Sequence, residues 1–120
     1  MKSLGLALVL AVVGACGGAG ATPTPAAQSV AVAEADFKIT PATTNLTGST
    51  FTFNVTSAGP TIHNFNIRNA SGATLTATKD LHTGESDSVT VALAPGTYTF
   101  FCAEPGHESL GMHGTFTVTQ

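Results

Sequence analysis

The chain has 120 residues, of which 42% are hydrophobic and only 9% are charged, and its formal net charge is −3 at pH 7. This length suits one compact domain rather than two. The acidic balance argues against nucleic acid as a partner, because binding to a phosphate backbone requires a basic surface.

The N-terminal segment has the pattern of an export signal. Lys2 precedes an apolar run, residues 4–13, which is too short to span a bilayer but suits the hydrophobic core of a signal peptide. The next residues, Val13-Gly-Ala-Cys16, resemble the bacterial lipoprotein cleavage box, in which the cysteine is lipidated and becomes the new N-terminus. We therefore expect a signal peptide over residues 1–15. Acyl chains on Cys16 would anchor the protein to a bacterial membrane, facing the periplasm or the cell exterior. The alternative is ordinary cleavage near these small residues, with Cys16 incidental.

Residues 16–29 are expected to form a flexible tether. From Gly17 to Ser29 the chain contains only Gly, Ala, Thr, Pro, Gln and Ser, so this stretch cannot supply a packed core. Its prolines favour an extended spacer. The folded domain is then expected to occupy residues 30–120.

The expected domain shows the alternation that is typical of β-strands. Three segments alternate apolar with polar residues, which indicates strands buried on one face; their apolar positions are Phe51, Phe53 and Val55, then Val89, Val91 and Leu93, then Phe116 and Val118. Glycine and proline interrupt the pattern at hairpin-like intervals. No segment keeps a helical period for more than two turns. We expect an all-β protein, a Greek-key β-sandwich of seven or eight strands.

Cys102 is the only cysteine in the expected domain, so it has no disulfide partner there, although an exported protein meets an oxidising environment. Such a thiol is deeply buried, reactive or held by a metal. His107 and Met112 follow it at loop-like spacings, and His63 lies upstream. Thiolate, imidazole and thioether form a soft ligand set that suits copper cycling between Cu(I) and Cu(II). Each residue alone would be taken for part of the core, and their joint occurrence favours a metal site.

The side-chain alternation of strands places these candidates on the inward side. His63, Cys102 and Met112 each share the parity of apolar residues in their own segments, so one end of a sandwich could gather them. His82 falls in an expected loop, and His113 has the opposite parity to Met112. We expect both of these histidines to face solvent rather than to bind metal.

Four sequence motifs in this order resemble the cupredoxins, the family of type 1 blue-copper proteins. The motifs are His63-Asn64-Phe65, Gly96-Thr-Tyr98-Thr-Phe-Phe-Cys102, Pro105-Gly106-His107 and Gly111-Met112. The resemblance covers essentially all of residues 30–120. A Cys-x4-His-x4-Met loop is most similar to those of rusticyanin, sulfocyanin and auracyanin, whereas the Cys-to-His segment of plastocyanin is shorter.

The resemblance implies one type 1 copper ion, with His63, Cys102 and His107 as strong ligands and Met112 as the axial ligand. It implies that Asn64 is the partner of the copper-bound sulfur and joins the two ligand segments. Ile62 stands where azurin has the glycine that offers its carbonyl oxygen to copper. We therefore expect four ligands and no carbonyl contact.

The function expected on this basis is membrane-tethered electron transfer by a monomer. In the family, the edge of the loop histidine, here His107, commonly reaches the surface within an apolar patch that meets redox partners. The candidates for this patch are Pro60, Pro105, Gly106, Leu110 and Gly111.

Two other function classes are weighed against electron transfer. An extracytoplasmic copper chaperone or storage module would favour methionine- and histidine-rich sites that release copper readily, and the thiolate and Asn64 argue for retention instead. The copper enzymes that resemble repeated cupredoxin domains carry additional histidine clusters, whereas this chain has four histidines in total. We therefore expect no catalytic activity.

Overall fold

The computed structural model describes residues 14, 17, 18, 20 and 25–120. The expected signal peptide, except for Gly14, and the expected lipid attachment site at Cys16 lie outside the described residues, so both stay predictions. In the part of the chain that the structure describes, no helix has the length and apolarity needed to cross a membrane.

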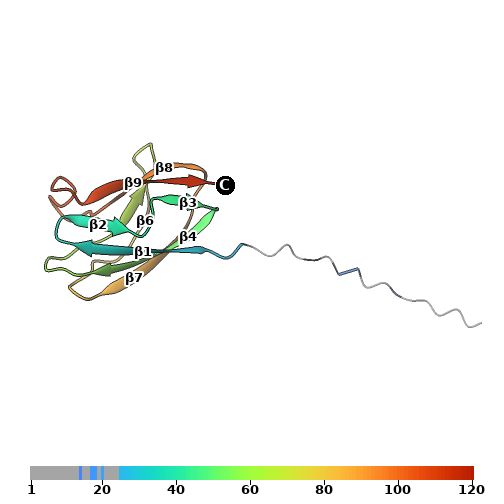
Figure 1. The fold of residues 1–120 in the computed structure, drawn as a ribbon, viewed down its shortest axis with the longest axis horizontal. Helices are drawn as coiled ribbons and strands as arrows, with labels where there is room; N and C mark the ends of the chain where they lie inside the picture. Colours follow the sequence, from blue (N-terminus) through green and yellow to red (C-terminus); the bar gives the residue numbers. More distant parts are fainter. Residues whose placement is uncertain (1–13, 15–16, 19, 21–24) are drawn as a thin grey trace, which may run out of the picture.

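The described residues form nine β-strands in two mixed sheets (Figure 1). The strands are β1 (Gln28–Ala35), β2 (Lys38–Pro41), β3 (Asn45–Thr47), β4 (Thr50–Ser57), β5 (Asn66–Arg68), β6 (Thr74–Ala77), β7 (Ser86–Ala92), β8 (Gly96–Phe101) and β9 (His113–Thr119). One sheet has the order β2-β1-β4-β7, and the other has the order β3-β9-β8-β5-β6. The pairs β1–β4 and β3–β9 are parallel.

The all-β sandwich expected from the sequence is confirmed, but the number of strands is higher than the expected seven or eight. β3 and β5 have three residues each, which is too short for an alternating pattern to be visible. The first strand begins at Gln28, two residues before the expected start of the domain.

The core lies between the two sheets and is built around β4. Phe51, Phe53 and Val55 are buried, as their alternation predicts. The ring of Phe53 lies 5.4 Å from that of Phe65 and 5.6 Å from that of Phe116, which joins the two sheets. Burial of each such side chain contributes about 1.5–3 kcal/mol to folding.

Strand β7 departs from the expected pattern of burial. Val89 and Val91 are only half-buried, although they pack against the core. β7 is an edge strand that pairs only with β4 within its sheet, so one side of it remains open to solvent. Alternation in the sequence identifies the inward face of a strand but not whether the strand is central or at an edge.

Three loops meet at one end of the sandwich, opposite the end that holds the C-terminus (Figure 1). They are the β1–β2 turn, the segment between β4 and β5, and the loop between β8 and β9. Backbone hydrogen bonds fix two of them, since His63 exchanges bonds with Leu81 and Cys102 donates to Met112 at 3.0 Å. This end of the sandwich therefore carries all the residues singled out from the sequence as candidate ligands.

Candidate metal centre

Three donor atoms converge at this end of the sandwich. One ring nitrogen of His63, one of His107 and the sulfur of Cys102 all lie within 4.8 Å of one another. The two Nδ1 atoms are 3.3 Å apart, and the sulfur lies 3.6 Å from Nδ1 of His107. His63 and Cys102 are fully buried, whereas His107 is partly exposed. The group is thus closed on its inner side and reaches the surface through one ring.

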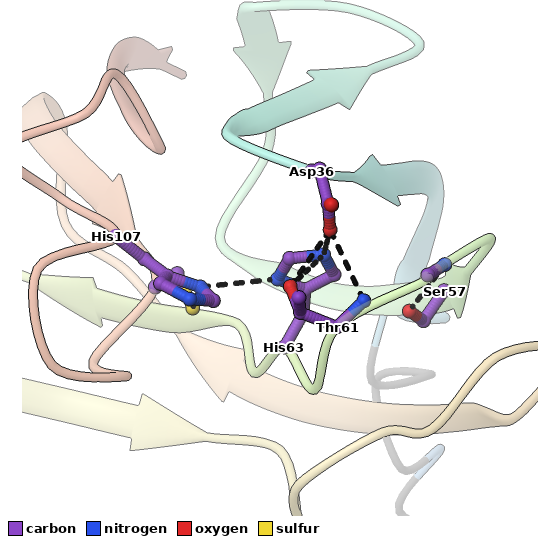
Figure 2. Close-up of polar contacts among 7 residues, drawn as sticks. Asp36, Ser57, Thr61, His63 and His107 are labelled. Carbon is purple, nitrogen blue, oxygen red and sulfur yellow. Dashed lines mark hydrogen bonds and ion pairs between the residues drawn. The ribbon is translucent and has the colours of Figure 1, made fainter.

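His63 is held from both its backbone and its ring. It lies just ahead of β5, in an isolated bridge with Leu81, and it is buried as its shared parity with Phe65 and Ile67 predicts. Between His63 and β5, Phe65 donates its backbone N–H to the Thr78 hydroxyl and accepts a hydrogen bond from the Thr78 backbone, both at 2.9 Å. The ring Nε2 lies 3.1 Å from Oδ1 of Asp36 (Figure 2). An ionised carboxylate can only accept a hydrogen bond, so Nε2 carries the ring proton. The other nitrogen, Nδ1, then has a free lone pair that faces the His107 ring and can bind a metal ion.

The carboxyl group of Asp36 is suited to that accepting role. Hydrogen bonding by the Thr61 hydroxyl, and also by the Thr61 backbone and His63, holds the pKa of Asp36 below its ordinary value. Asp36 therefore stays ionised at neutral pH. It accepts a hydrogen bond from Nε2–H of His63, and the proton stays on the ring.

The loop after β8 is closed by its own backbone hydrogen bonds. Cys102 donates to the carbonyl of Met112, and Met112 donates to that of His107 at 3.1 Å. Gly106 and Gly111 have φ values of +80° and +116°, a conformation that favours glycine. Met112 is fully buried directly before β9. The loop thus brings all three of its candidate ligands to one place from a segment of eleven residues.

Burial raises the pKa of the Cys102 thiol above its ordinary value, while backbone hydrogen bonds from Asn64 and Glu104 oppose the rise. The thiol of the copper-free protein is therefore protonated at neutral pH. Because the thiolate is the form that binds metal, metal binding must release this proton.

Asn64 joins the segment of His63 to the segment of Cys102. Its side-chain oxygen accepts hydrogen bonds from the Ala103 backbone at 2.7 Å and from Asn66 at 2.7 Å. Its amide nitrogen donates to Asp80 at 2.9 Å and to Glu104 at 3.2 Å. The side chain thus holds the backbone that follows Cys102, and the hydrogen bond of Asn64 to the sulfur comes from its backbone.

Replacing Asn64 by leucine is expected to lower the free energy of unfolding by about 1–3 kcal/mol, because the side-chain amide of the buried Asn66 and the backbone N–H of Ala103 both lose their acceptor. Urea denaturation of the copper-free protein measures this loss. The matched control is Asn54→Leu on the exposed face of β4, where the side chain bonds only Ser88. Its expected change is within about 0.5 kcal/mol. Equal losses in the two variants would contradict the structural role of Asn64.

The remaining histidines lie where the sequence placed them, in positions that face solvent. His82 and His113 are exposed, and neither belongs to the cluster of donor atoms in the described residues. The candidate patch residues are exposed as well; they are Pro60, Pro105, Gly106, Leu110 and Gly111.

Sequence reasoning missed two residues of the β1–β2 turn. Asp36 contacts His63, as described above, and the ring of Phe37 meets that of His107 edge-on with centroids 5.4 Å apart. Phe37 and Ile62 are also among the large apolar side chains exposed on the surface, with 41% and 37% exposure. The run Asp-Phe is unremarkable in the sequence, and no spacing relates it to histidines that follow 27 or more residues later.

The distances between the donor atoms fit a single first-row metal ion. Two nitrogen ligands ~2.0–2.1 Å from one ion, at angles between tetrahedral and trigonal, lie about 3.3–3.6 Å apart. The observed separation of the two Nδ1 atoms, 3.3 Å, falls in this range. Two imidazoles, a thiolate and a thioether make up the donor set of mononuclear blue-copper sites; here the buried Met112 is joined to Cys102 and His107 by backbone hydrogen bonds. The fold and the site together define a β-sandwich with a soft-metal centre at one end.

Comparison with known families agrees with this class. The model of the cupredoxin-like domain family matches residues 5–118, and the chain belongs to this family. Copper, as one type 1 ion, is the cofactor of the family, and the His63, Cys102 and His107 cluster fits it.

The individual proteins to which the chain is similar include auracyanins. A stretch of 40 residues is 58% identical to auracyanin-B of Chloroflexus aurantiacus. This stretch covers 32% of the present chain and 17% of auracyanin-B, so the match spans well under two thirds of the length of that relative. A structure of auracyanin B is 28% identical with a TM-score of 0.63, covering 83% of this chain and 94% of the other. The reduced auracyanin of the photosynthetic bacterium Roseiflexus castenholzii shares the fold, with 24% identity, a TM-score of 0.66, and coverage of 79% and 99%.

Proposed function

We propose that this protein is a membrane-tethered blue-copper electron carrier that cycles between Cu(I) and Cu(II). The observation that carries the proposal is the convergence of two imidazoles and one thiol within 4.8 Å at one end of a β-sandwich. Membership of the cupredoxin-like family supports the role in electron transfer. Only one such cluster occurs in the described residues, which favours an electron carrier over an enzyme with several metal centres.

In this proposal His63, Cys102 and His107 are the strong copper ligands and Met112 is the axial ligand. When bound, copper supplies a one-electron redox couple. The protein contributes a set of donors that three loops hold in place, through hydrogen bonds that do not involve the metal. A scaffold of this kind limits the change in geometry between the two oxidation states, and a small change favours rapid electron transfer.

Electrons would enter and leave through the exposed side of His107. Two exposed apolar residues lie beside His107: the ring of Phe37 packs edge-on against it, and Leu110, whose backbone bonds the His107 carbonyl, is 60% exposed. Apolar contacts of limited area suit weak, short-lived redox encounters. A monomer that docks its partners at this end accounts for the exposed side chains without a permanent interface.

The tether to the membrane rests on the sequence pattern. A signal peptide over residues 1–15, lipidation of Cys16 and a spacer as far as residue 29 would place the domain outside the cytoplasmic membrane, in the periplasm or at the cell exterior. The copper end of the sandwich lies opposite the end from which residues 25–27 lead away (Figure 1). A lipid anchor would therefore leave His107 free to meet partners.

The test is spectroscopy and voltammetry of the copper-loaded chain from Gly17 onward. We expect one copper per chain, an intense thiolate-to-copper absorption in the visible range, a type 1 paramagnetic-resonance spectrum and reversible one-electron cycling. A colourless or binuclear product would contradict the proposed site. Ready transfer of copper to an acceptor protein, without reversible cycling, would instead support a copper chaperone or storage module.

A further inference from the structure

The turn between β1 and β2 contacts both histidines of the metal centre. β1 ends at Ala35 and β2 begins at Lys38, which pairs with Ala35, so the turn consists of Asp36 and Phe37 alone. Asp36 contacts His63 and Phe37 contacts His107. Two consecutive residues therefore contact two rings that are 44 residues apart in the chain.

Asp36 is itself held in place before it can hold His63. Its Oδ1 accepts hydrogen bonds from the Thr61 hydroxyl at 2.7 Å and from the Thr61 backbone at 3.1 Å. The same oxygen lies 3.1 Å from Nε2 of His63 (Figure 2). Because His63 is fully buried and Asp36 is 30% exposed, the carboxylate reaches inward to the ring. Rotation of the imidazole would break this bond, so the contact fixes the ring orientation.

Phe37 adopts a strained backbone to reach the second ring. It is the only non-glycine residue with a positive φ among the described residues, at +60°. This conformation costs about 1–2 kcal/mol for a residue with a side chain. Phe37 is 41% exposed, so burial of its side chain does not account for the strained backbone. A strained residue beside a candidate metal centre suggests a role in that centre.

The turn also packs against the loop that carries His107. The carbonyl oxygen of Phe37 lies 3.3 Å from the position that a Cβ at residue 111 would occupy, and that residue is Gly111. A side chain there would press on the turn. The turn and the ligand loop are therefore in close backbone contact directly before Met112.

We propose that the Asp36-Phe37 turn is a positioning element of the copper centre, in which Asp36 orients His63 and sets the reduction potential while Phe37 orients His107. This inference rests on the proposed function, because it takes both histidines as copper ligands. Reduction of Cu(II) by one electron from a redox partner lowers the positive charge of the centre by one unit. A carboxylate hydrogen-bonded to a ligand histidine stabilises the higher charge, so Asp36 lowers the potential.

The charge of Asp36 is tested with Asp36→Asn in the copper-loaded chain. The amide oxygen can still accept from His63, so copper is retained, but the negative charge is lost. We expect the affinity ratio of Cu(II) to Cu(I) to fall about tenfold, which raises the potential of a one-electron couple by ~59 mV. The control is Asp87→Asn, whose carboxylate likewise accepts from backbone amides but contacts none of the donor residues. An equal potential in the two variants would overturn the proposed charge effect.

The orienting role of Asp36 is tested with Asp36→Ala, which removes the acceptor as well. Cu(II) affinity is expected to fall about 10–100-fold, as for other partners of metal-bound histidines. Histidine nitrogen spectra of the copper-free chain give a second reading: His63 is in the Nε2–H form in the native protein and Asp36→Asn, and in mixed forms in Asp36→Ala. An unchanged tautomer in Asp36→Ala would overturn the role. This reading is independent of copper, so it separates failure of the inference from failure of the proposed function.

The role of Phe37 is tested with Phe37→Gly, which relieves the strained φ and removes the ring. We expect the His107 ring of the copper-free chain to sample several orientations, seen as averaged ring-proton shifts, whereas His63 keeps its single form. Unchanged His107 shifts would show that the loop alone orients this ring and would overturn this part of the proposal.

Discussion

Replacing Cys102 by serine is expected to abolish the intense visible absorption of the copper-loaded protein. That absorption arises from charge transfer between a thiolate and Cu(II), and Cys102 supplies the one thiol of the described residues, where it is buried and forms no disulfide. A serine hydroxyl is a hard and weakly basic donor, so it cannot replace the sulfur at neutral pH. Absorption spectra of Cu(II)-loaded protein measure the effect directly.

The matched control for this prediction is Cys16→Ser in the full chain. It removes the second cysteine of the sequence, at the expected lipid attachment site, and leaves the metal centre intact. We expect this variant to keep its colour. Thermal unfolding of the copper-free Cys102→Ser protein shows whether it folds, so that loss of colour can be assigned to the ligand. Undiminished absorption in folded Cys102→Ser would refute the assignment of Cys102.

Replacing Glu34 by glutamine is expected to remove a large pH dependence from the stability of the copper-free protein. Glu34 lies on β1 with no exposed surface, and neither of its carboxyl oxygens has a hydrogen-bond partner in the described residues. Burial raises the pKa of this carboxyl group from 4.5 to about 7. A group of this kind is buried at low cost when neutral and at high cost when charged.

The direction follows from proton binding in the two states. Between pH 4.5 and about 7 the folded protein holds the Glu34 proton while the unfolded chain has lost it, so the free energy of unfolding falls as pH rises. The penalty is absent below the unfolded pKa and complete above the folded pKa. At about 1.4 kcal/mol per pKa unit, the full loss is about 3 kcal/mol.

Urea denaturation of the copper-free protein between pH 4 and pH 8.5, a range of about 4.5 pH units that brackets both pKa values, measures this loss. Glu34→Gln is expected to match the native protein near the acid end and to exceed its stability by up to about 3 kcal/mol at the alkaline end. The control is Glu85→Gln, an exposed carboxyl group whose pKa is lowered by the His82 backbone. This control should keep the alkaline loss. Curves of the same shape for the native protein and Glu34→Gln would show that Glu34 is not its source.

The residues of the proposed metal centre could be selected from the sequence because of two local properties. Strand alternation places Met112 on the same face as Phe116 and Val118 of β9, and all three residues are buried in the structure. Short loop spacing confines Cys102, His107 and Met112 to one end of the chain's last hairpin. Covalent geometry imposes both relations, so neither requires knowledge of the rest of the fold.

Three features could not be predicted from the sequence in this way. They are the short strands, the half-burial of β7, and the residues that contact the two histidines. β3 and β5 exist as strands because neighbours pair with them, and their own three residues carry no period. Glu34 shares the inward parity of Val30 and Val32, but alternation does not reveal that its oxygens find no partner. These features depend on what the rest of the chain places beside each residue.

By itself, therefore, the sequence determined the class of fold, the inward direction of His63, Cys102 and Met112, and the soft chemistry of the site. Only the tertiary structure decided that Asp36 accepts a hydrogen bond from the His63 ring and that the Phe37 ring packs against the His107 ring. The physical reason is that side-chain type and parity are properties of neighbouring residues along a chain. A hydrogen bond or ring contact between a turn and a distant loop exists only after the sheets have packed and brought those segments within a few ångströms.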